Sequence, residues 1–350
     1  MAVAIKKKIR LIVPKYPLTA RSNGLSLYSP YFKIPKMFWF AYRVLARTEI
    51  IDILAHRNSD PYVEEVMYDW EILVEKMGQH LNADKLIPAF YFPRQNIRHK
   101  AGVLLMRDDG MPLGFGRIAY DIESQKGLEQ ELSALTWLQQ NKWKCFNSPS
   151  ILGKGSHGKM TYLVETYVPP GTRQIRTGIS YIENNLLAEL CEKSKKRQRI
   201  TNMVWFNKSR PCSKIWNQIF TLIQELEPSD GYTMCAVHGD YTPWNMRKAK
   251  DGIMWLFDWE DFSDCAPKLV DPLHYYMVVK LLLEKKNPQF TGREIGGILK
   301  QQIREGLITT GDALLALTYL RFRSPPFFTE DIWRKLEKEV ITLFQNDYPL

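Results

Sequence analysis

Residues 235–260 read CAVHGDYTPWNMRKAKDGIMWLFDWE, and this segment carries the strongest structural signal in the chain. Its apolar start ends at Val237, and the loop that follows carries Asp240 and, five residues later, Asn245. A second apolar run leads directly to Asp258. The alternation of apolar runs and turn residues predicts strands that bring two carboxylates and one amide into the same neighbourhood.

Phosphoryl transfer needs side chains of these three kinds. One carboxylate orients the attacking hydroxyl and accepts its proton, while oxygen ligands hold the Mg²⁺ that bridges the nucleotide phosphates. Protein kinases use an Asp, an Asn five residues later and an Asp from a further motif for these roles. For Asp240 alone, a side chain that only satisfies a turn is the favoured interpretation. The trio in its strand context favours a phosphotransferase.

The residue order in this segment resembles one family in particular. The motif His238-Gly-Asp240-x-x-x-x-Asn245, followed by Asp258-Trp-Glu260, is similar to the aminoglycoside and choline phosphotransferase superfamily, and it looks closest to uncharacterised bacterial members. The resemblance implies an α+β, bilobal, protein-kinase-like fold with a small β-rich N-lobe and a larger, mainly helical C-lobe. It implies that Asp240 is the catalytic base, that Asn245 and Asp258 bind Mg²⁺, and that ATP supplies the phosphate.

Three regions are expected along the chain. Residues 1–80 are expected to form an N-terminal helical extension, residues 81–168 the nucleotide-binding N-lobe, and residues 169–350 the C-lobe for catalysis and substrate binding. The family resemblance covers about residues 86–280.

Hydrophobic periodicity and turn residues predict the individual elements. Asp108-Asp109-Gly110 is typical of a hairpin turn, and Asp60-Pro61 of a helix start. The expected strands are 87–92, 102–107, 113–120, 150–152, 160–168 and 253–257. The expected helices are 37–55, 62–81, 125–140, 180–196, 212–227, 271–286, 293–305, 311–323 and 329–346.

The resemblance implies a strand lysine that contacts the α- and β-phosphates and pairs with a helix glutamate. Arg117 stands at the matching strand position, and a guanidinium is not interchangeable with an ammonium group. Glu131 is the expected partner, because it lies about 45° from the centre of the leucine stripe of the 125–140 helix. A surface position for Glu131 is the alternative. We expect Arg117 to lie within hydrogen-bond reach of Glu131.

Two loops complete the expected nucleotide lobe. The resemblance implies that residues 94–99 cover the phosphates and that Glu165 to Val168 form the hinge, which offers backbone groups to the adenine. Gly153-Lys-Gly155-Ser-His-Gly158 matches a dinucleotide-binding pattern literally. That pattern requires a following helix, whereas Met160 onward predicts a strand, so a hairpin turn is expected instead.

Other polar residues near the motif have structural interpretations. His238 is expected to hydrogen-bond the loop backbone rather than to act as an acid or base. Glu260 either orients Asp258 or faces solvent. Asp271 followed by Pro is expected to be a helix N-cap.

Two basic segments admit two interpretations each. Residues 193–199 are favoured as a solvated helix end over a patch for an anionic substrate. Residues 33–47 mix Lys and Arg with Phe, Trp and Tyr, and such aromatics more often cover a core than rest on a membrane. A peripheral membrane contact is therefore the less favoured interpretation.

Bulk composition excludes several classes. The 350 residues are 45% hydrophobic and 25% charged, a globular balance. The five scattered cysteines have no CxxC spacing, so no zinc pattern is expected. No signal-peptide core and no run of about eighteen apolar residues occur, so the cytoplasm is the expected location and no transmembrane segment is expected. The net charge of +10 favours an anionic partner, but no nucleic-acid-binding signature accompanies it.

The sequence therefore predicts an ATP- and Mg²⁺-dependent small-molecule kinase that phosphorylates a hydroxyl. A sugar or glycan precursor is the first expectation for the acceptor, followed by an amino alcohol or an aminoglycoside; this ranking rests on family analogy. The alternative is a catalytically weak, nucleotide-binding pseudokinase that regulates or scaffolds a partner. Arg117 supports this alternative, and the trio of Asp240, Asn245 and Asp258 opposes it.

Overall fold

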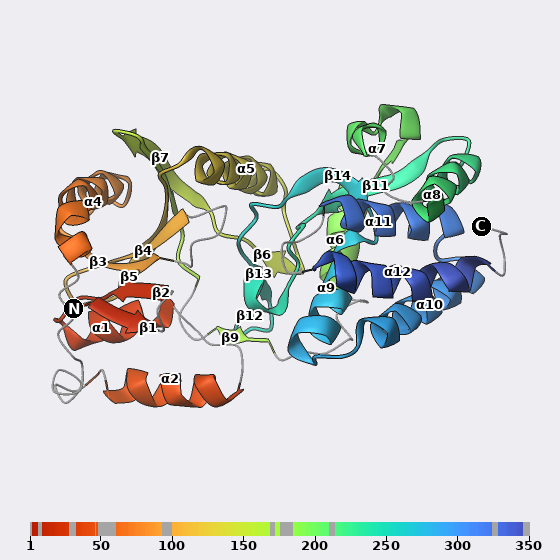
Figure 1. Ribbon diagram of the computed structural model, residues 1–350. Helices are drawn as coiled ribbons and strands as arrows, with labels where there is room; N and C mark the ends of the chain where they lie inside the picture. The colour runs from red at the N-terminus through yellow and green to blue at the C-terminus, as the bar shows by residue number, and fades with distance from the viewer. Residues whose placement is uncertain are drawn as a thin grey trace. The chain divides into compact units, whose positions relative to one another are not determined.

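The structure is a computed structural model that describes residues 2–5, 9–27, 33–45, 47, 61–92, 100–168, 172–175, 185–209, 214–323 and 328–345. The chain divides into two compact units (Figure 1). Unit 1 comprises residues 1–142 and 148–172, and unit 2 comprises residues 143–147 and 173–350.

Unit 1 is built on a seven-stranded sheet in which every neighbouring pair of strands is antiparallel. Short connections such as the hairpin turn after Met106 allow this antiparallel order. The strands, in their spatial order, are β1 (Ala2–Ile5), β2 (Ile9–Ile12), β3 (Ile87–Phe92), β4 (Lys100–Met106), β5 (Pro112–Ala119), β8 (Met160–Glu165) and β7 (Ile151–His157).

Helices cover both faces of this sheet, because β3 and β4 present apolar side chains on both sides. Helix α4 (Pro61–His80) packs Trp70, Leu73 and Met77 on one face. Helices α1 (Leu18–Gly24) and α2 (Lys33–Leu45) pack on the opposite face. Helix α5 (Ile122–Gln139) contacts β5, β7 and β8 and begins with a capping box at Asp121.

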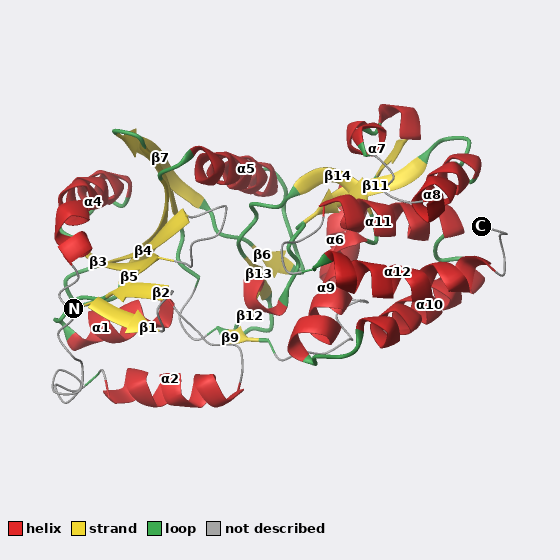
Figure 2. Ribbon diagram, viewed as in Figure 1, coloured by secondary structure: helices red, strands yellow, loops and turns green. Residues whose placement is uncertain are grey.

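Unit 2 is mainly helical and carries two small sheets (Figure 2). One sheet has the order β10 (Lys196–Gln198), β11 (Tyr232–Val237), β14 (Ser263–Pro267), and the other has the order β6 (Phe146–Asn147), β13 (Met254–Leu256), β12 (Met246–Lys248), β9 (Arg173–Gln174). The helices are α6 (Asn185–Ser194), α7 (Val204–Lys208), α8 (Lys214–Glu225), α9 (Val270–Met277) with a π-helical continuation (Val278–Leu283), α10 (Pro288–Arg304), α11 (Thr310–Arg323) and α12 (Glu330–Gln345).

The α+β division into a strand-rich unit and a helical unit is as predicted from the sequence. The helices and strands expected between residues 87 and 168 and between 212 and 346 are present. The glycine-rich segment at 153–158 forms β7 and its hairpin turn, so the structural interpretation is confirmed. The loop expected over the phosphates, residues 94–99, lies outside the described residues.

Three expectations differ from the structure. The first 80 residues supply the strands β1 and β2 of the large sheet, so they are not a purely helical extension. Helix α2 ends at Leu45, earlier than expected, and residues 48–60 lie outside the described part. The basic segment 193–199 is only partly helical. Its β10 part pairs with the edge of β11, because the backbone N–H and C=O groups of β11 require hydrogen-bond partners there.

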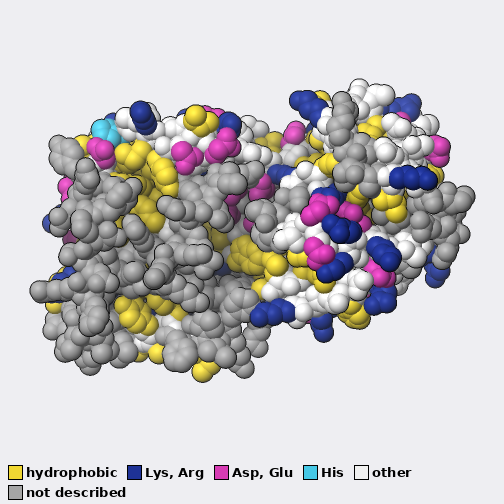
Figure 3. All heavy atoms as spheres, viewed as in Figure 1, with side chains coloured by type: hydrophobic (Ala, Val, Ile, Leu, Met, Phe, Trp, Pro, Cys, Tyr) yellow, Lys and Arg dark blue, Asp and Glu magenta, His cyan; other side chains and the backbone are white. Residues whose placement is uncertain are grey.

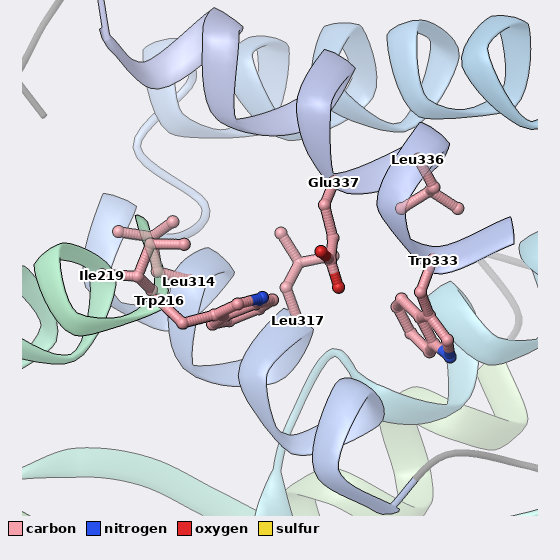
Figure 4. A pocket seen from close by; sticks show the side chains of 7 residues that line it. All are labelled: Trp216, Ile219, Leu314, Leu317, Trp333, Leu336 and Glu337. Atoms are coloured by element: carbon pink, nitrogen blue, oxygen red, sulfur yellow. The ribbon is translucent and has the colours of Figure 1, made fainter. Parts of the chain in front are cut away.

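The helical core of unit 2 contains a small cavity between α8, α11 and α12 (Figure 4). Its volume is about 20 Å³, which is room for roughly one water molecule. Trp216 and Trp333 flank it, and the carboxylate of Glu337 lies 2.7 Å from Nε of Arg321. A cavity of this size does not accommodate a small-molecule acceptor. Within the described residues, no helix has both the length and the apolarity to cross a membrane.

The close packing of α4 on the sheet predicts a specific sensitivity at Gly116. A Cβ atom there would lie 2.5 Å from Cγ1 of Val103 and 2.8 Å from Sδ of Met77. We expect Gly116→Ala to lower the free energy of unfolding by about 1–3 kcal/mol, measured by urea denaturation. The matched control is Gly297→Ala in α10, where an added Cβ atom would meet nothing within 4 Å beyond its chain neighbours and the nearby helix backbone, and a gain of about 0.5–1 kcal/mol is expected. Equal effects of the two changes would contradict the packing argument.

Candidate active site

The loop that carries Asp240 leaves the buried strand β11 through a tight bend. Gly239 adopts a φ of +86°, and a Cβ atom at this position would collide with the carbonyl group of Asp261. Only glycine tolerates both conditions. The bend ends the apolar strand at Val237 and delivers the Asp240 side chain to the loop, as the sequence predicted.

Asp271 holds this bend in place. Its Oδ2 atom accepts a hydrogen bond of 2.7 Å from the backbone N–H of His238, and its Oδ1 atom accepts one of 2.9 Å from Gly239. The residue is 2% exposed, and burial raises the pKa of its carboxyl to about 6 against the lowering effect of the two donors. The expectation that Asp271 is an N-cap is wrong: Leu269 is the N-cap of α9, and the carboxylate serves the loop instead.

His238 has a structural role, as expected. Its fully buried ring lies 4.4 Å from the ring of Trp259, measured between centroids, and its Nε2 atom is 3.2 Å from the carbonyl oxygen of Phe257. Because that carbonyl can only accept, Nε2 carries the hydrogen. Burial lowers the pKa of His238 to about 4, so the ring is neutral at physiological pH.

Asp240 and Asn245 form one hydrogen-bonded unit. A short 3₁₀ turn over Pro243–Asn245 brings the amide back, and its Nδ2 atom donates to Oδ2 of Asp240 at 2.8 Å and to the Asp240 carbonyl oxygen at 3.0 Å. The amide nitrogen is therefore committed to Asp240. The carbonyl oxygen of the Asn245 side chain is the atom that remains for a cation.

The charge around Asp240 is unbalanced. Burial, together with the nearby carboxylates of Asp258 and Asp261, raises the pKa of Asp240 to about 8 against the lowering effect of the Asn245 amide. His274 Nε2 lies 3.9 Å from Asp240 Oδ1, but burial lowers the pKa of His274 to about 3. The neutral imidazole does not offset the negative charge. A site of this kind attracts a cation.

Asp258 lies two residues after the end of β13 and has a φ of +69°, in the left-handed region that non-glycine residues rarely occupy. A hydrogen bond of 3.2 Å from Phe257 N to Asn245 O holds the preceding residue beside the Asn245 turn. Backbone strain of this type costs about 1–3 kcal/mol and tends to occur at functional sites.

The donor set fits Mg²⁺. Asn245 and Asp258 offer one amide oxygen and one carboxylate, which are hard oxygen donors. In the described part of the chain, no group of three or more His, Cys, Asp and Glu side chains is arranged to hold a metal ion. Mg²⁺ keeps several waters and is bound through one or two carboxylates together with substrate phosphates, so Asn245 and Asp258 are the residues that would hold it.

Unit 1 contains a separate cluster of buried charges. Nε of Arg117 lies 3.1 Å from Oε1 of Glu131, so the predicted ion pair is present, and 3.3 Å from Oε1 of Glu165. Lys100 was not predicted: its Nζ lies 2.6 Å from Oε2 of Glu131, and its side chain is 6% exposed. The available signal in the sequence was its place directly before the apolar run from Ala101 to Met106.

Sheet register explains why both cations reach one glutamate. Gly102 on β4 pairs with Arg117 on β5, and Lys100 pairs with Ala119. Lys100 is two residues from Gly102, so Lys100 and Arg117 lie diagonally on the same face of the sheet. Glu165, at the end of β8, pairs with Phe115 and shares that face.

The Glu165 side chain takes part in this cluster. Burial raises the pKa of Glu165, and the Arg117 guanidinium counteracts this. Val168 follows three residues later and is half-buried. A hydrogen bond of 2.9 Å from Thr166 N to Ser150 O fixes the start of the segment 166–168. The hinge role of Glu165 to Val168 stays a prediction.

Comparison with known proteins identifies similar folds only. No protein-family model matches the chain, and no curated protein matches it in sequence. A solved structure of a thermostable aminoglycoside phosphotransferase mutant with ADP and hygromycin B is 10% identical, with a TM-score of 0.46, and the match covers 79% of this chain and 98% of that one. An ADP-bound aminoglycoside phosphotransferase is 12% identical, with a TM-score of 0.40, and the match covers 77% of this chain and 95% of that one.

Choline kinase LicA from Streptococcus pneumoniae is 11% identical, with a TM-score of 0.30, and the match covers 79% of this chain and 90% of that one. All three solved structures are less than 25% identical to this chain, so the comparison concerns the fold alone.

The raised pKa of the partly buried Asp240 carboxyl predicts a pH-dependent stability. Because its folded pKa of about 8 exceeds the value of 3.8 for an exposed Asp, the native state binds the proton more tightly. This contribution to stability is therefore present at low pH and is lost as the pH rises from about 4 to about 8. We expect Asp240→Asn to raise the free energy of unfolding at pH 8.5 by about 1–3 kcal/mol and to change it little at pH 4.

Chemical denaturation at both pH values, without nucleotide or Mg²⁺, measures this effect. The control is Asp108→Asn at an exposed hairpin position, which should leave the free energy of unfolding unchanged at both pH values. A loss of stability at pH 8.5 in Asp240→Asn would show that the ionised carboxylate is instead stabilising.

Proposed function

We propose that the chain is an ATP- and Mg²⁺-dependent phosphotransferase that moves the γ-phosphate to the hydroxyl of a small molecule. The observation that carries the proposal is the hydrogen-bonded unit of Asp240 and Asn245 beside the strained Asp258. It offers a carboxylate with a raised pKa together with two oxygen donors for a divalent cation. General base catalysis works best when the pKa of the base lies near the working pH.

Each residue of the trio has a distinct proposed role. Asp240 orients the acceptor hydroxyl and takes its proton as the oxygen attacks the γ-phosphate, while ADP leaves with the electrons of the broken P–O bond. Asn245 holds Asp240 through its amide nitrogen and offers its oxygen to Mg²⁺, and Asp258 is the second Mg²⁺ ligand. When bound, Mg²⁺ neutralises phosphate charge and lowers the pKa of neighbouring acids.

The charged cluster of unit 1 is the proposed binding site for the nucleotide phosphates. Glu131 anchors two cations, of which Lys100 supplies the compact ammonium group that the sequence lacks at position 117. Arg117 adds a second phosphate donor held by Glu165. The backbone from Glu165 to Val168 is proposed to receive the adenine.

The proposed acceptor is a small molecule that carries a hydroxyl group. A sugar or glycan precursor is the first candidate, followed by an amino alcohol or an aminoglycoside. Attraction of a cationic acceptor by Asp261 and Asp264 is not favoured, because both have cations nearby. Arg323 donates to the Asp261 carbonyl oxygen and lies 3.4 Å from its carboxylate. Lys196 lies 3.4 Å from the Asp264 carboxylate. A cytoplasmic location and the absence of a nucleic-acid partner also stay predictions.

The second candidate is a pseudokinase that binds nucleotide without efficient turnover. Arg117 in place of a lysine favours it. The buried Lys100 weakens this support, because the same glutamate has an ammonium partner after all.

Substitution of Asp240 tests the proposed chemistry. We expect Asp240→Asn to lower kcat by about 10²–10⁴-fold while MgATP affinity is retained, because the base acts on the acceptor and not on the nucleotide. Turnover is measured against a panel of sugars, amino alcohols and aminoglycosides, and binding by calorimetry. The exposed Asp264 gives the control Asp264→Asn, which should retain its activity. If Asp240→Asn keeps wild-type turnover, Asp240 is not the base.

Substitution in the unit 1 cluster distinguishes the two cations. We expect Lys100→Met to raise the KM for ATP at least about tenfold, because it removes the ammonium group and leaves Glu131 with one partner. Arg117→Lys should have a smaller effect, since a cation remains. Lys154→Met, at an exposed position of β7, is the control. Loss of ATP use in Arg117→Lys but not in Lys100→Met would assign the phosphate contact to Arg117 alone.

A further inference from the structure

The positive net charge of the chain is concentrated at one end of the sequence. Residues 1–48 contain ten Lys and Arg and no Asp or Glu. The other 302 residues contain 38 Lys and Arg and 38 Asp and Glu, so they carry no net charge. On the helices of unit 2 the two signs alternate, as in the ion pair of 2.7 Å between Arg321 and Glu330 (Figure 3). The proposed nucleotide site therefore does not account for the charge of +10.

Helix α2 lies within this basic segment and uses one face to pack on unit 1. Trp39 and Tyr42 stack on each other with ring centroids 5.3 Å apart, and both contact the apolar cluster around Val13, Leu25 and Leu104. The expectation that aromatics of residues 33–47 cover a core therefore holds for these two side chains.

The opposite face of α2 is apolar and exposed. Met37 is 64% exposed, Phe40 is 68% exposed and Val44 is 48% exposed, and Ala41 lies between them. Positions 37, 40, 41 and 44 form one stripe on a helix with about 3.6 residues per turn. At about 100° per residue, this stripe is centred roughly opposite Trp39 and Tyr42. Unit 1 therefore leaves a continuous apolar stripe uncovered.

We propose that the outer face of α2 binds the surface of a membrane that contains anionic lipids. An interfacial helix buries its apolar stripe at the level of the acyl chains while neighbouring cations meet the headgroups. Residues 28–48 supply Lys33, Lys36, Arg43 and Arg47 with no acidic residue. Each cation near such a surface contributes favourably to binding, so charge and apolar exposure act together.

The charge of this segment argues against the two other occupants. A second copy of the chain would bring an equally basic segment against the stripe, and like charges would repel. A nucleic acid would use the cations for its phosphates but would leave Met37, Phe40 and Val44 in water. A lipid surface uses both features. The proposal is independent of the phosphotransferase activity, since none of these residues belongs to the charged cluster of unit 1 or to the trio of unit 2.

Vesicle flotation with the full chain tests the proposal. We expect binding to vesicles of phosphatidylcholine with about 30% phosphatidylserine, weak binding to phosphatidylcholine alone, and release at high salt. Phe40→Ser should weaken binding at least about tenfold. Lys33→Gln combined with Lys36→Gln should weaken it by about thirtyfold.

Matched controls lie on unit 2. Phe290→Ser removes a phenylalanine that is 44% exposed on α10, and Arg304→Gln combined with Arg334→Gln removes two exposed charges. Both controls should bind vesicles like the wild type. The proposal is overturned if the wild type binds neither kind of vesicle, or if Phe290→Ser loses as much binding as Phe40→Ser. Sedimentation velocity that shows a dimer abolished by Phe40→Ser would assign the stripe to a second copy instead.

Discussion

The two hydrogen bonds that Asp271 accepts from His238 and Gly239 are the contact on which the rest of the Asp240 loop depends. The two donors are backbone N–H groups at the end of a buried strand, and without a partner each would cost about 1–3 kcal/mol. Asp271 lies 33 residues beyond His238 in the sequence, so the start of α9 sets the shape of a loop that precedes it. The bend at Gly239 and the neutral ring of His238 then fix where Asp240 emerges.

Both units contain buried charged groups whose burial opposes folding. In unit 2, Asp240 lies near other carboxylates, and its raised pKa records the cost of ionising it there. In unit 1, Lys100 and Arg117 share Glu131, and Arg117 also contacts Glu165, in a mostly buried cluster. Buried ion pairs seldom stabilise a fold more than apolar packing does. Their presence in both units is typical of sites retained for binding or chemistry.

The cluster of unit 1 also shows what a single strand position does and does not specify. An arginine at position 117, considered alone, supported the alternative of a catalytically weak pseudokinase. The antiparallel register places Lys100 diagonally across from Arg117, so the neighbouring strand supplies an ammonium group to the same glutamate. The two cations that contact Glu131 are therefore set by one face of the sheet rather than by one residue of one strand.

The sequence by itself determined most helices and strands between residues 87 and 168 and between 212 and 346, because apolar periodicity records them directly. It also placed Asp240 and Asn245 in one loop after a buried strand, and the family resemblance implied the pairing of Arg117 with Glu131. It did not determine that Asp271 serves the loop, that Lys100 joins Glu131, or that β2 extends the sheet at β3. Only the tertiary structure decided these, because each depends on strand register or on a contact between residues far apart in the chain. Helix α2 shows the same division. Its composition left open whether its aromatic side chains cover a core or lie on the surface, and the structure packs Trp39 against the apolar cluster and leaves Phe40 exposed.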